Sequence, residues 1–272
     1  MRSWTLFGGI AAATAVLTIA AAVGASARPL AANPYNLATP GTLVVGMDLE
    51  FKPEMYLQNG KPAGYDVELL NAVAKQLNVK LKIQNLSFNG LIPGLVSKKF
   101  DMVSVGLSPT PERRKAISFS RAYVPYAQIL AAKKGDTTGA SMSAWNDSSK
   151  TITSLQGSTA EQLVKSDFPK AKSSSFPDQN SAFLQVATGR ANGIVVENYL
   201  LAQFNKSNGN KLQEVPFPKP LQVQYGAYGV QKGNVALVKA LNGAICKVQA
   251  SGELAKIYQK TEGTKLPPMP GC

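Results

Sequence analysis

The feature that most constrains the fold is a regular alternation of strand-like and helix-like segments in the first half of the chain. Residues 42–47, TLVVGM, form an apolar run of the length of a buried strand. Residues 66–78 repeat apolar side chains at helical spacing, and residues 79–84 alternate apolar and polar side chains like a half-buried strand. A second helix over 89–97 and a strand over 102–105 follow. Such alternation is typical of α/β layering, in which helices pack against a sheet.

A second α/β set follows a polar segment, residues 136–150, which is predicted to be a loop. The length of 272 residues suits one large domain or two of ordinary size. No internal repeat is evident. In the first half, Pro93 fits its helix only near the first turn, because proline lacks an amide hydrogen. The remaining predicted elements are strands at 151–155, 193–196 and 223–231 and helices at 159–168, 178–188, 197–204, 235–248 and 253–259.

The first 27 residues have the pattern of a secretory signal peptide. Arg2 supplies a positive start, and Leu6 to Val23 is an uncharged run of 18 residues. Ala25-Ser26-Ala27 then gives the small-x-small pattern of a cleavage site. A membrane anchor is the alternative, because spanning a bilayer takes about 20 apolar residues, but the Ala, Gly and Thr content favours a signal. We expect cleavage after Ala27, export to the periplasm, and a poorly ordered lead over residues 28–40.

The composition excludes several classes of function. The net charge is +13, but the lysines are scattered, in pairs at most, without the basic run and aromatics of a nucleic-acid site. No nucleic-acid partner is therefore predicted. The chain has no histidine, which removes histidine-based triads and histidine metal sites. No metal or cofactor is predicted, and the protein is expected to be a monomer.

The chain holds two cysteines, Cys246 and the C-terminal Cys272. Export would place both in an oxidising compartment, where a disulfide between them would tie the tail to the helix that carries Cys246. A redox role is disfavoured because there is no C-x-x-C pair. We expect a structural disulfide.

The stretch from Asp101 to Tyr126, DMVSVGLSPTPERRKAISFSRAYVPY, carries the clearest chemistry. A short apolar strand turns through Gly106 and Ser108, and Arg113 follows five residues later at the start of a short predicted helix. Such a loop gathers backbone amides, a hydroxyl and a guanidinium, which together suit a carboxylate, because a planar guanidinium can hold one bidentately. The alternative is that Arg113 is a surface arginine beside a turn.

This stretch closely resembles the signature of the family 3 periplasmic solute-binding proteins, the amino-acid receptors of ABC importers. The resemblance spans about residues 40–260. It implies that Gly106, Ser108 and Arg113 hold the α-carboxylate of a free amino acid. It also implies an α/β, two-lobed periplasmic binding protein fold of type II, in which each lobe is a sheet flanked by helices and two crossover strands, near 127–133 and 224–231, join the lobes.

Three further segments match that family. GMDLEFKP, residues 46–53, implies that Phe51 covers the ligand and that Asp48 meets its side chain. LSFNGLIP, residues 86–93, makes Phe88 the opposite aromatic wall. LQGSTAE, residues 155–161, implies a second grip on the carboxylate, with Thr159 donating from its hydroxyl and amide at a helix start. Without the resemblance, both phenylalanines read as core residues and Thr159 as a helix cap.

A fourth segment, GRANGIVVENY at residues 189–199, departs from the family pattern. Glu197 and Asn192 stand where the family usually has aspartate. The resemblance implies that Glu197 takes the α-ammonium, although glutamate is longer by one methylene. The alternative is a surface carboxylate at a helix start.

The implied domains are a discontinuous first lobe, residues 41–131 plus 226–272, and a second lobe, residues 132–225. The implied function is non-catalytic capture of an amino acid, with a polar or cationic side chain slightly favoured because of Asp48, and its delivery to the permease of an ABC importer. Two alternatives stay open: a cyclohexadienyl-type dehydratase on the same fold, and a ligand sensor without a transport role.

Overall fold

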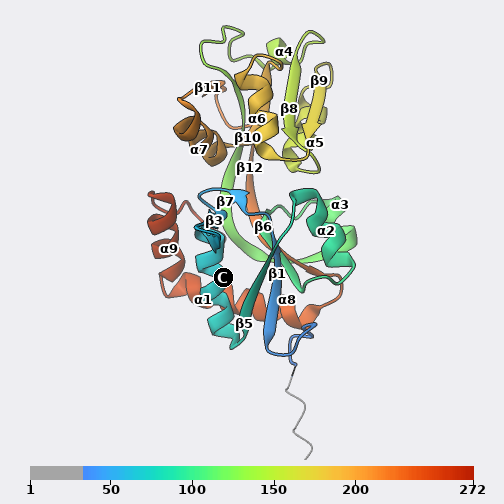
Figure 1. The fold of residues 1–272 in the computed structure, drawn as a ribbon, viewed down its shortest axis with the longest axis vertical. Helices are drawn as coiled ribbons and strands as arrows, with labels where there is room; N and C mark the ends of the chain where they lie inside the picture. Colours follow the sequence, from blue (N-terminus) through green and yellow to red (C-terminus); the bar gives the residue numbers. More distant parts are fainter. Residues whose placement is uncertain (1–32) are drawn as a thin grey trace, which may run out of the picture. The chain divides into compact units, whose positions relative to one another are not determined.

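The computed structural model describes residues 33–272, whose strands form one large mixed sheet and one small sheet (Figure 1). The predicted leader, residues 1–27, lies outside the described residues. In the large sheet the strand order is β5-β1-β6-β12-β7-β10-β8-β9, and β11 pairs with β7. These strands are β1 (Thr42–Met47), β5 (Lys80–Asn85), β6 (Met102–Leu107), β7 (Ile117–Lys133), β8 (Thr151–Leu155), β9 (Lys172–Phe176), β10 (Gly193–Glu197), β11 (Leu212–Glu214) and β12 (Gln222–Gln231).

Two long strands in the middle of the sheet, β7 and β12, join two groups of shorter strands. They pair antiparallel with each other over Gln222–Gln231. On one side β12 pairs with β6, which leads to the parallel pairs of β1 with β6 and β5. On the other side β7 pairs with β10, which leads to the parallel strands β8 and β9. The shorter parallel strands carry apolar side chains on both faces of the sheet. Helices pack on these faces and shield the side chains from water.

The helices cover these two groups of strands, which confirms the predicted α/β layering with two crossover strands. α1 contacts α8 and α9 on the β1 side, whereas α5 and α6 contact β8 on the other. Side-chain caps begin several helices: Ser158 accepts from the amide of Glu161, and Asp178 from that of Ser181. The helices are α1 (Tyr65–Leu77), α2 (Phe88–Val96), α3 (Pro111–Ala116), α4 (Met142–Trp145), α5 (Thr159–Asp167), α6 (Gln179–Ala187), α7 (Asn198–Asn208), α8 (Val235–Ala250) and α9 (Glu253–Glu262).

Several elements differ from the sequence-based expectation. Pro93 lies inside α2 rather than in its first turn; in a helix of nine residues it removes a single internal hydrogen bond. Leu37, in the lead expected to be poorly ordered, is buried, and Asn33 hydrogen-bonds its backbone. The segment 136–150 contains the short helix α4. Five strands were not predicted: β9, β11 and the three strands of the small sheet, which are β2 (Glu50–Phe51), β3 (Met55–Gln58) and β4 (Lys61–Ala63); β2 is only two residues long.

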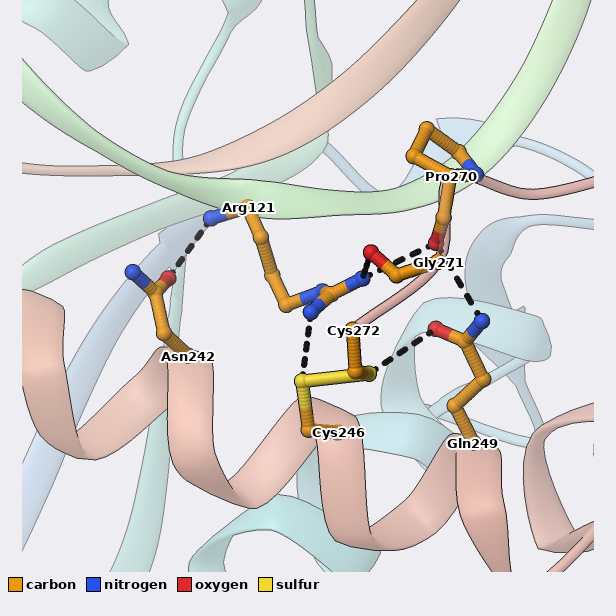
Figure 2. Close-up of a disulfide and its surroundings, with 7 residues drawn as sticks. All are labelled: Arg121, Asn242, Cys246, Gln249, Pro270, Gly271 and Cys272. Carbon is orange, nitrogen blue, oxygen red and sulfur yellow. Dashed lines mark hydrogen bonds between the residues drawn. A yellow bond between two sulfur atoms is a disulfide. The ribbon is translucent and has the colours of Figure 1, made fainter.

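A disulfide joins Cys246 on α8 to Cys272, as predicted (Figure 2). The guanidinium of Arg121 on β7 donates to Cys246 Sγ and to the carbonyl oxygens of Pro270 and Gly271, at 2.9 Å each for the two carbonyls. Gln249 on α8 also donates to the carbonyl of Pro270 at 3.2 Å. The tail is thus held covalently to α8 and by hydrogen bonds to β7.

Removing this disulfide is expected to destabilise the fold by about 3 kcal/mol, because the open chain regains the entropy of a loop closed by residues 26 apart. Urea unfolding of the variant Cys246→Ser/Cys272→Ser would measure the loss. Wild-type protein unfolded under strong reductant is the control and should show the same decrease. A midpoint unchanged in both samples would contradict a stabilising role.

Three acidic side chains lie close together where the N-terminus of α1 meets the end of α9: the buried Glu54 and Asp66 and the half-buried Glu262. Asp66 is fully buried and accepts hydrogen bonds from Ser104 Oγ at 2.8 Å and from the hydroxyl of Tyr123 at 2.7 Å. Burial raises the pKa of Asp66 to about 7, against the lowering effect of these donors, and burial raises the pKa of Glu262 to about 7. Burial also raises the pKa of Glu54 well above its usual range, reinforced by Glu262 and Asp66. Among residues 33–272, no such group is arranged to hold a metal ion.

These shifts predict that the protein becomes less stable as the pH rises. The folded state keeps protons that the unfolded state releases above about pH 4, so stability is fully present below that pH and is lost as the pH rises through about 7. Urea unfolding at pH values from 4 to 8 would measure the slope. Glu262→Gln should flatten it and leave the pH 4 value unchanged, whereas Glu214→Gln, at an exposed position, should leave the slope intact. A stability that increases from pH 4 to 8 would oppose this prediction.

Candidate functional site

A cavity lies where the strands of the two groups meet the β7–β12 pair. Its walls come from β2, α2, β6 and α3 on one side and from α5, β10 and α7 on the other. Of the eight predicted ligand-binding residues, six line it: Phe51, Phe88, Gly106, Arg113, Thr159 and Glu197. The other lining residues are Val105, Leu107, Tyr126, Leu155, Ser158, Tyr199 and Leu200.

Arg113 spans the cavity from α3. Thr110 caps that helix by accepting from the Arg113 amide at 3.2 Å, which fixes the backbone beneath the side chain. The guanidinium donates through Nη1 to the carbonyl of Ser108 and through Nη2 to the carbonyl of Gly157, each at 3.0 Å. Only 8% of Arg113 is exposed, and burial lowers the pKa of its guanidinium. A buried cation thus contacts the loop after β6 and the turn before α5 at once.

The apolar wall is formed by Phe51 and Phe88. The two rings meet edge to face, with centroids 6.3 Å apart and planes at 86°, rather than lying parallel. The guanidinium carbon of Arg113 lies 5.8 Å from the centroid of Phe88, within range of a cation–π contact. The rings therefore form a corner that suits the aliphatic part of a ligand.

Asp48 lies near the start of α2, where the backbone amide of Phe88 acts on its carboxyl, and it does not line the cavity itself. It is 5% exposed. Burial, with a smaller contribution from Glu50, raises the pKa of Asp48 to about 7, although the backbone amides of Phe88 and Glu50 oppose the shift. A cation placed near Asp48 would favour its ionised form.

Glu197 and Thr159 lie on the side of the cavity that faces Arg113. Glu197 ends β10 and precedes α7, and its Oε1 accepts from Gln128 Nε2 at 2.8 Å. Burial raises the pKa of Glu197, while Gln128 and Arg113 lower it. Thr159 begins α5, behind the cap residue Ser158, and its hydroxyl donates to Gln224 Oε1 at 2.9 Å. The Thr159 hydroxyl is thus already paired within the protein.

Gly106 lines the cavity near the end of β6, whereas Ser108, just after that strand, does not. Gly106 is in the left-handed region, with φ 59°, which suits a residue without a side chain. Its amide donates to the hydroxyl of Tyr123 at 2.9 Å, and its carbonyl accepts from Tyr126 at 2.6 Å. The Ser108 hydroxyl lies outside the cavity, bonded to Gln224 Oε1 at 2.6 Å and 2.5 Å from the Tyr126 oxygen. Ligand contacts of Gly106 and Ser108 stay a prediction.

Sequence reasoning missed four polar residues at this site: Tyr126, Gln128, Tyr199 and Gln224. Gln128 interrupts an apolar part of β7, and this interruption is a signal that could have identified it. Gln224 stands in the mixed segment QVQY of β12, which gives no such signal. Their partners are far away in sequence, up to 116 residues for the Ser108–Gln224 bond. Local patterns contain no information at that range.

The sequence matches one known family and many solved proteins. Residues 43–264 match the bacterial extracellular solute-binding proteins, family 3. "ABC transporter arginine-binding protein 1" of Escherichia coli (strain K12) is 28% identical, covering 84% of this chain and 93% of that protein. The "probable histidine-binding protein" of Neisseria gonorrhoeae is 29% identical, covering 96% and 95% of the two chains.

Solved structures of amino acid-binding proteins are also similar to this chain. An ancestral arginine-binding protein bound to arginine has a TM-score of 0.75 and 32% identity over 81% of this chain and 97% of its own. An ancestral amino acid-binding protein described as a precursor of cyclohexadienyl dehydratase has a TM-score of 0.73 and 31% identity, over 81% and 94%.

The fold is that of a two-lobed, periplasmic-type solute-binding protein. The chain belongs to the bacterial extracellular solute-binding proteins, family 3, which confirms the resemblance found in the sequence. Within residues 33–272, no helix has both the length and the apolar character to cross a membrane.

Proposed function

We propose that this protein captures a free amino acid with a cationic side chain between its two lobes and delivers it to an ABC importer. The supporting observation is that a buried Arg113 and a half-buried Glu197 line the same cavity. A zwitterion offers a carboxylate to the first and an ammonium to the second. The names of relatives that bind arginine or histidine support a cationic ligand.

The side chain of the ligand would lie along the corner formed by Phe51 and Phe88 and end near Asp48. A cation there would gain an attraction to the Asp48 carboxylate and would lower its pKa from about 7. Glu50 and Asp178 are further negative charges that act on Asp48. An acidic side chain would meet repulsion in the same place.

In this proposal, ligand binding is coupled to closure of the two lobes. The proposed lobes are residues 41–131 plus 226–272 and residues 132–225, so that Arg113 and Glu197 come from different lobes. A ligand that contacts both favours the closed form, because only closure completes its contacts. The importer would recognise that form. We further propose a monomeric periplasmic protein, exported by its leader and cleaved after Ala27.

A thermal-shift and calorimetric panel of amino acids tests the proposed function. Arginine, lysine and histidine are expected to raise the unfolding temperature, and glutamate is not. A ligand at 100 times its dissociation constant adds about 2.7 kcal/mol of stability, which is readily measured. Stabilisation by glutamate alone, or by none of the common amino acids, would overturn the proposal.

One observation favours a second candidate, a dehydratase. Glu197 is a half-buried carboxyl with a raised pKa, as a general acid requires, and one structural neighbour is described as a dehydratase precursor. Incubation with prephenate or arogenate, with chromatographic detection of aromatic product, decides between them. We propose that no product forms, because the Glu197 carboxyl faces Arg113 and Gln128, which favour its ionised form.

A further inference from the structure

Two buried glutamines lie on the long strands that join the two groups of shorter strands. Gln128 on β7 is fully buried, and Gln224 on β12 is 7% exposed. A buried amide costs free energy unless it is hydrogen-bonded, so the position of each partner matters. All the partners belong to the candidate site or lie beside it.

Gln128 donates both hydrogens of its side-chain amide nitrogen, one to Glu197 on β10 and one to Thr159 on α5. Nε2 donates to Glu197 Oε1 at 2.8 Å and to Thr159 Oγ1 at 3.2 Å. Gln128 and Glu197 are also directly opposite each other in the β7–β10 ladder. The strand register and the side-chain bond therefore fix one carboxylate oxygen of Glu197 and leave the other without that constraint.

Gln224 connects both sides of the cavity through one oxygen. Its Oε1 accepts from Ser108 Oγ at 2.6 Å and from Thr159 Oγ1 at 2.9 Å. Its amide nitrogen donates to Gln222, which lies opposite Gln128 in the β7–β12 ladder. A continuous polar row thus runs from Glu197 through Gln128 and Thr159 to Gln224 and Ser108.

We propose that Gln128 and Gln224 are positioning residues of the amino-acid site: Gln128 orients Glu197 and Thr159, and Gln224 aligns Thr159 with Ser108. The inference rests on the proposed function. Under this inference, the crossover strands β7 and β12 do more than join the lobes. They also supply side chains that set the geometry of the ligand-binding groups.

The contact of Gln128 with Glu197 has an electrostatic consequence. The charged and titratable groups that face Glu197 are Arg113 from α3, Tyr126 from β7 and Tyr199 from α7. Gln128 is its side-chain hydrogen-bond donor, and a donor favours the ionised carboxyl. Loss of this donor should raise the pKa of Glu197 and weaken binding most at low pH.

The test compares Gln128→Met and Gln224→Met with Gln213→Met, a control on β11 whose side chain hydrogen-bonds Gly135 and lies outside the cavity. Calorimetry with L-arginine is expected to show at least tenfold weaker binding for the first two variants and less than a twofold change for the control. Binding within threefold of wild type in both test variants would overturn the proposal.

A second measurement needs no ligand. Titration of side-chain-labelled glutamate by NMR, with Glu197→Gln to assign the signal, should show the pKa of Glu197 rising in Gln128→Met and unchanged in Gln224→Met, which does not touch Glu197. An unchanged value in Gln128→Met would refute the positioning role. If wild type binds no amino acid, the proposed function fails, but this titration still decides the role of Gln128. Should Gln128→Met not fold, Gln224→Met alone decides through its affinity.

Discussion

Replacing Arg113 with alanine is expected to weaken binding of L-arginine by roughly 3–5 kcal/mol, because the α-carboxylate would then be buried without its partner. The expected loss corresponds to at least a hundredfold increase in the dissociation constant measured by calorimetry. The variant Arg113→Lys should recover only part of the affinity, since lysine keeps the charge but lacks the planar fork.

Arg114→Ala is the matched control for this experiment. Arg114 is the next residue of α3 and is exposed. Its guanidinium carbon lies 5.4 Å from the centroid of the Phe119 ring, and Arg114 does not line the cavity. The variant Arg114→Ala should bind L-arginine as tightly as wild type does. A second control uses the ligand: argininamide, which lacks the carboxylate charge, should bind Arg113→Ala and wild type with similar weak affinity. Less than a tenfold loss for Arg113→Ala with the true ligand would refute the assignment.

Replacing Glu197 with alanine is expected to cost about 2–5 kcal/mol of binding, since the α-ammonium would lose a desolvated charge partner. The same reasoning predicts that affinity falls as the pH drops through the raised pKa of Glu197, because the protonated carboxyl no longer attracts the ammonium. Calorimetry at several pH values would measure both effects.

An analogue of arginine without its α-amino group isolates the Glu197 contact. It should bind Glu197→Ala and wild type equally, whereas L-arginine should distinguish them strongly. Glu214→Gln serves again as the control at an exposed position. Unchanged affinity of Glu197→Ala for L-arginine would place the ammonium elsewhere.

The sequence was sufficient to predict elements with a strong local pattern. The apolar run of β1, the helical spacing in α1 and the long stripe of α8 all appear where expected, with ends displaced by at most two residues. The edge strand β9, KSSSF, was missed because it has no apolar alternation. Such a strand is defined by its parallel partner β8, not by its own composition.

For the candidate site too, the sequence predicted the residues that belong to local motifs but not the contacts between distant residues. Motifs identified Arg113, Glu197 and Thr159, which the structure brings to one cavity. Motifs could not show that the Thr159 hydroxyl pairs with Gln224, because that bond joins residues 65 apart. Nor could they show that the Gly106 amide is already used by Tyr123.

The strand β7 contacts three separate parts of the protein. Arg121 holds the C-terminal tail, Tyr123 donates to the buried Asp66, Tyr126 lines the cavity, and Gln128 donates to Glu197 in the cavity wall. Because successive side chains of a strand alternate between faces, inserting or deleting one residue within β7 would turn every later side chain to the opposite face. Insertions and deletions during evolution should therefore collect in the 136–150 segment and spare this strand.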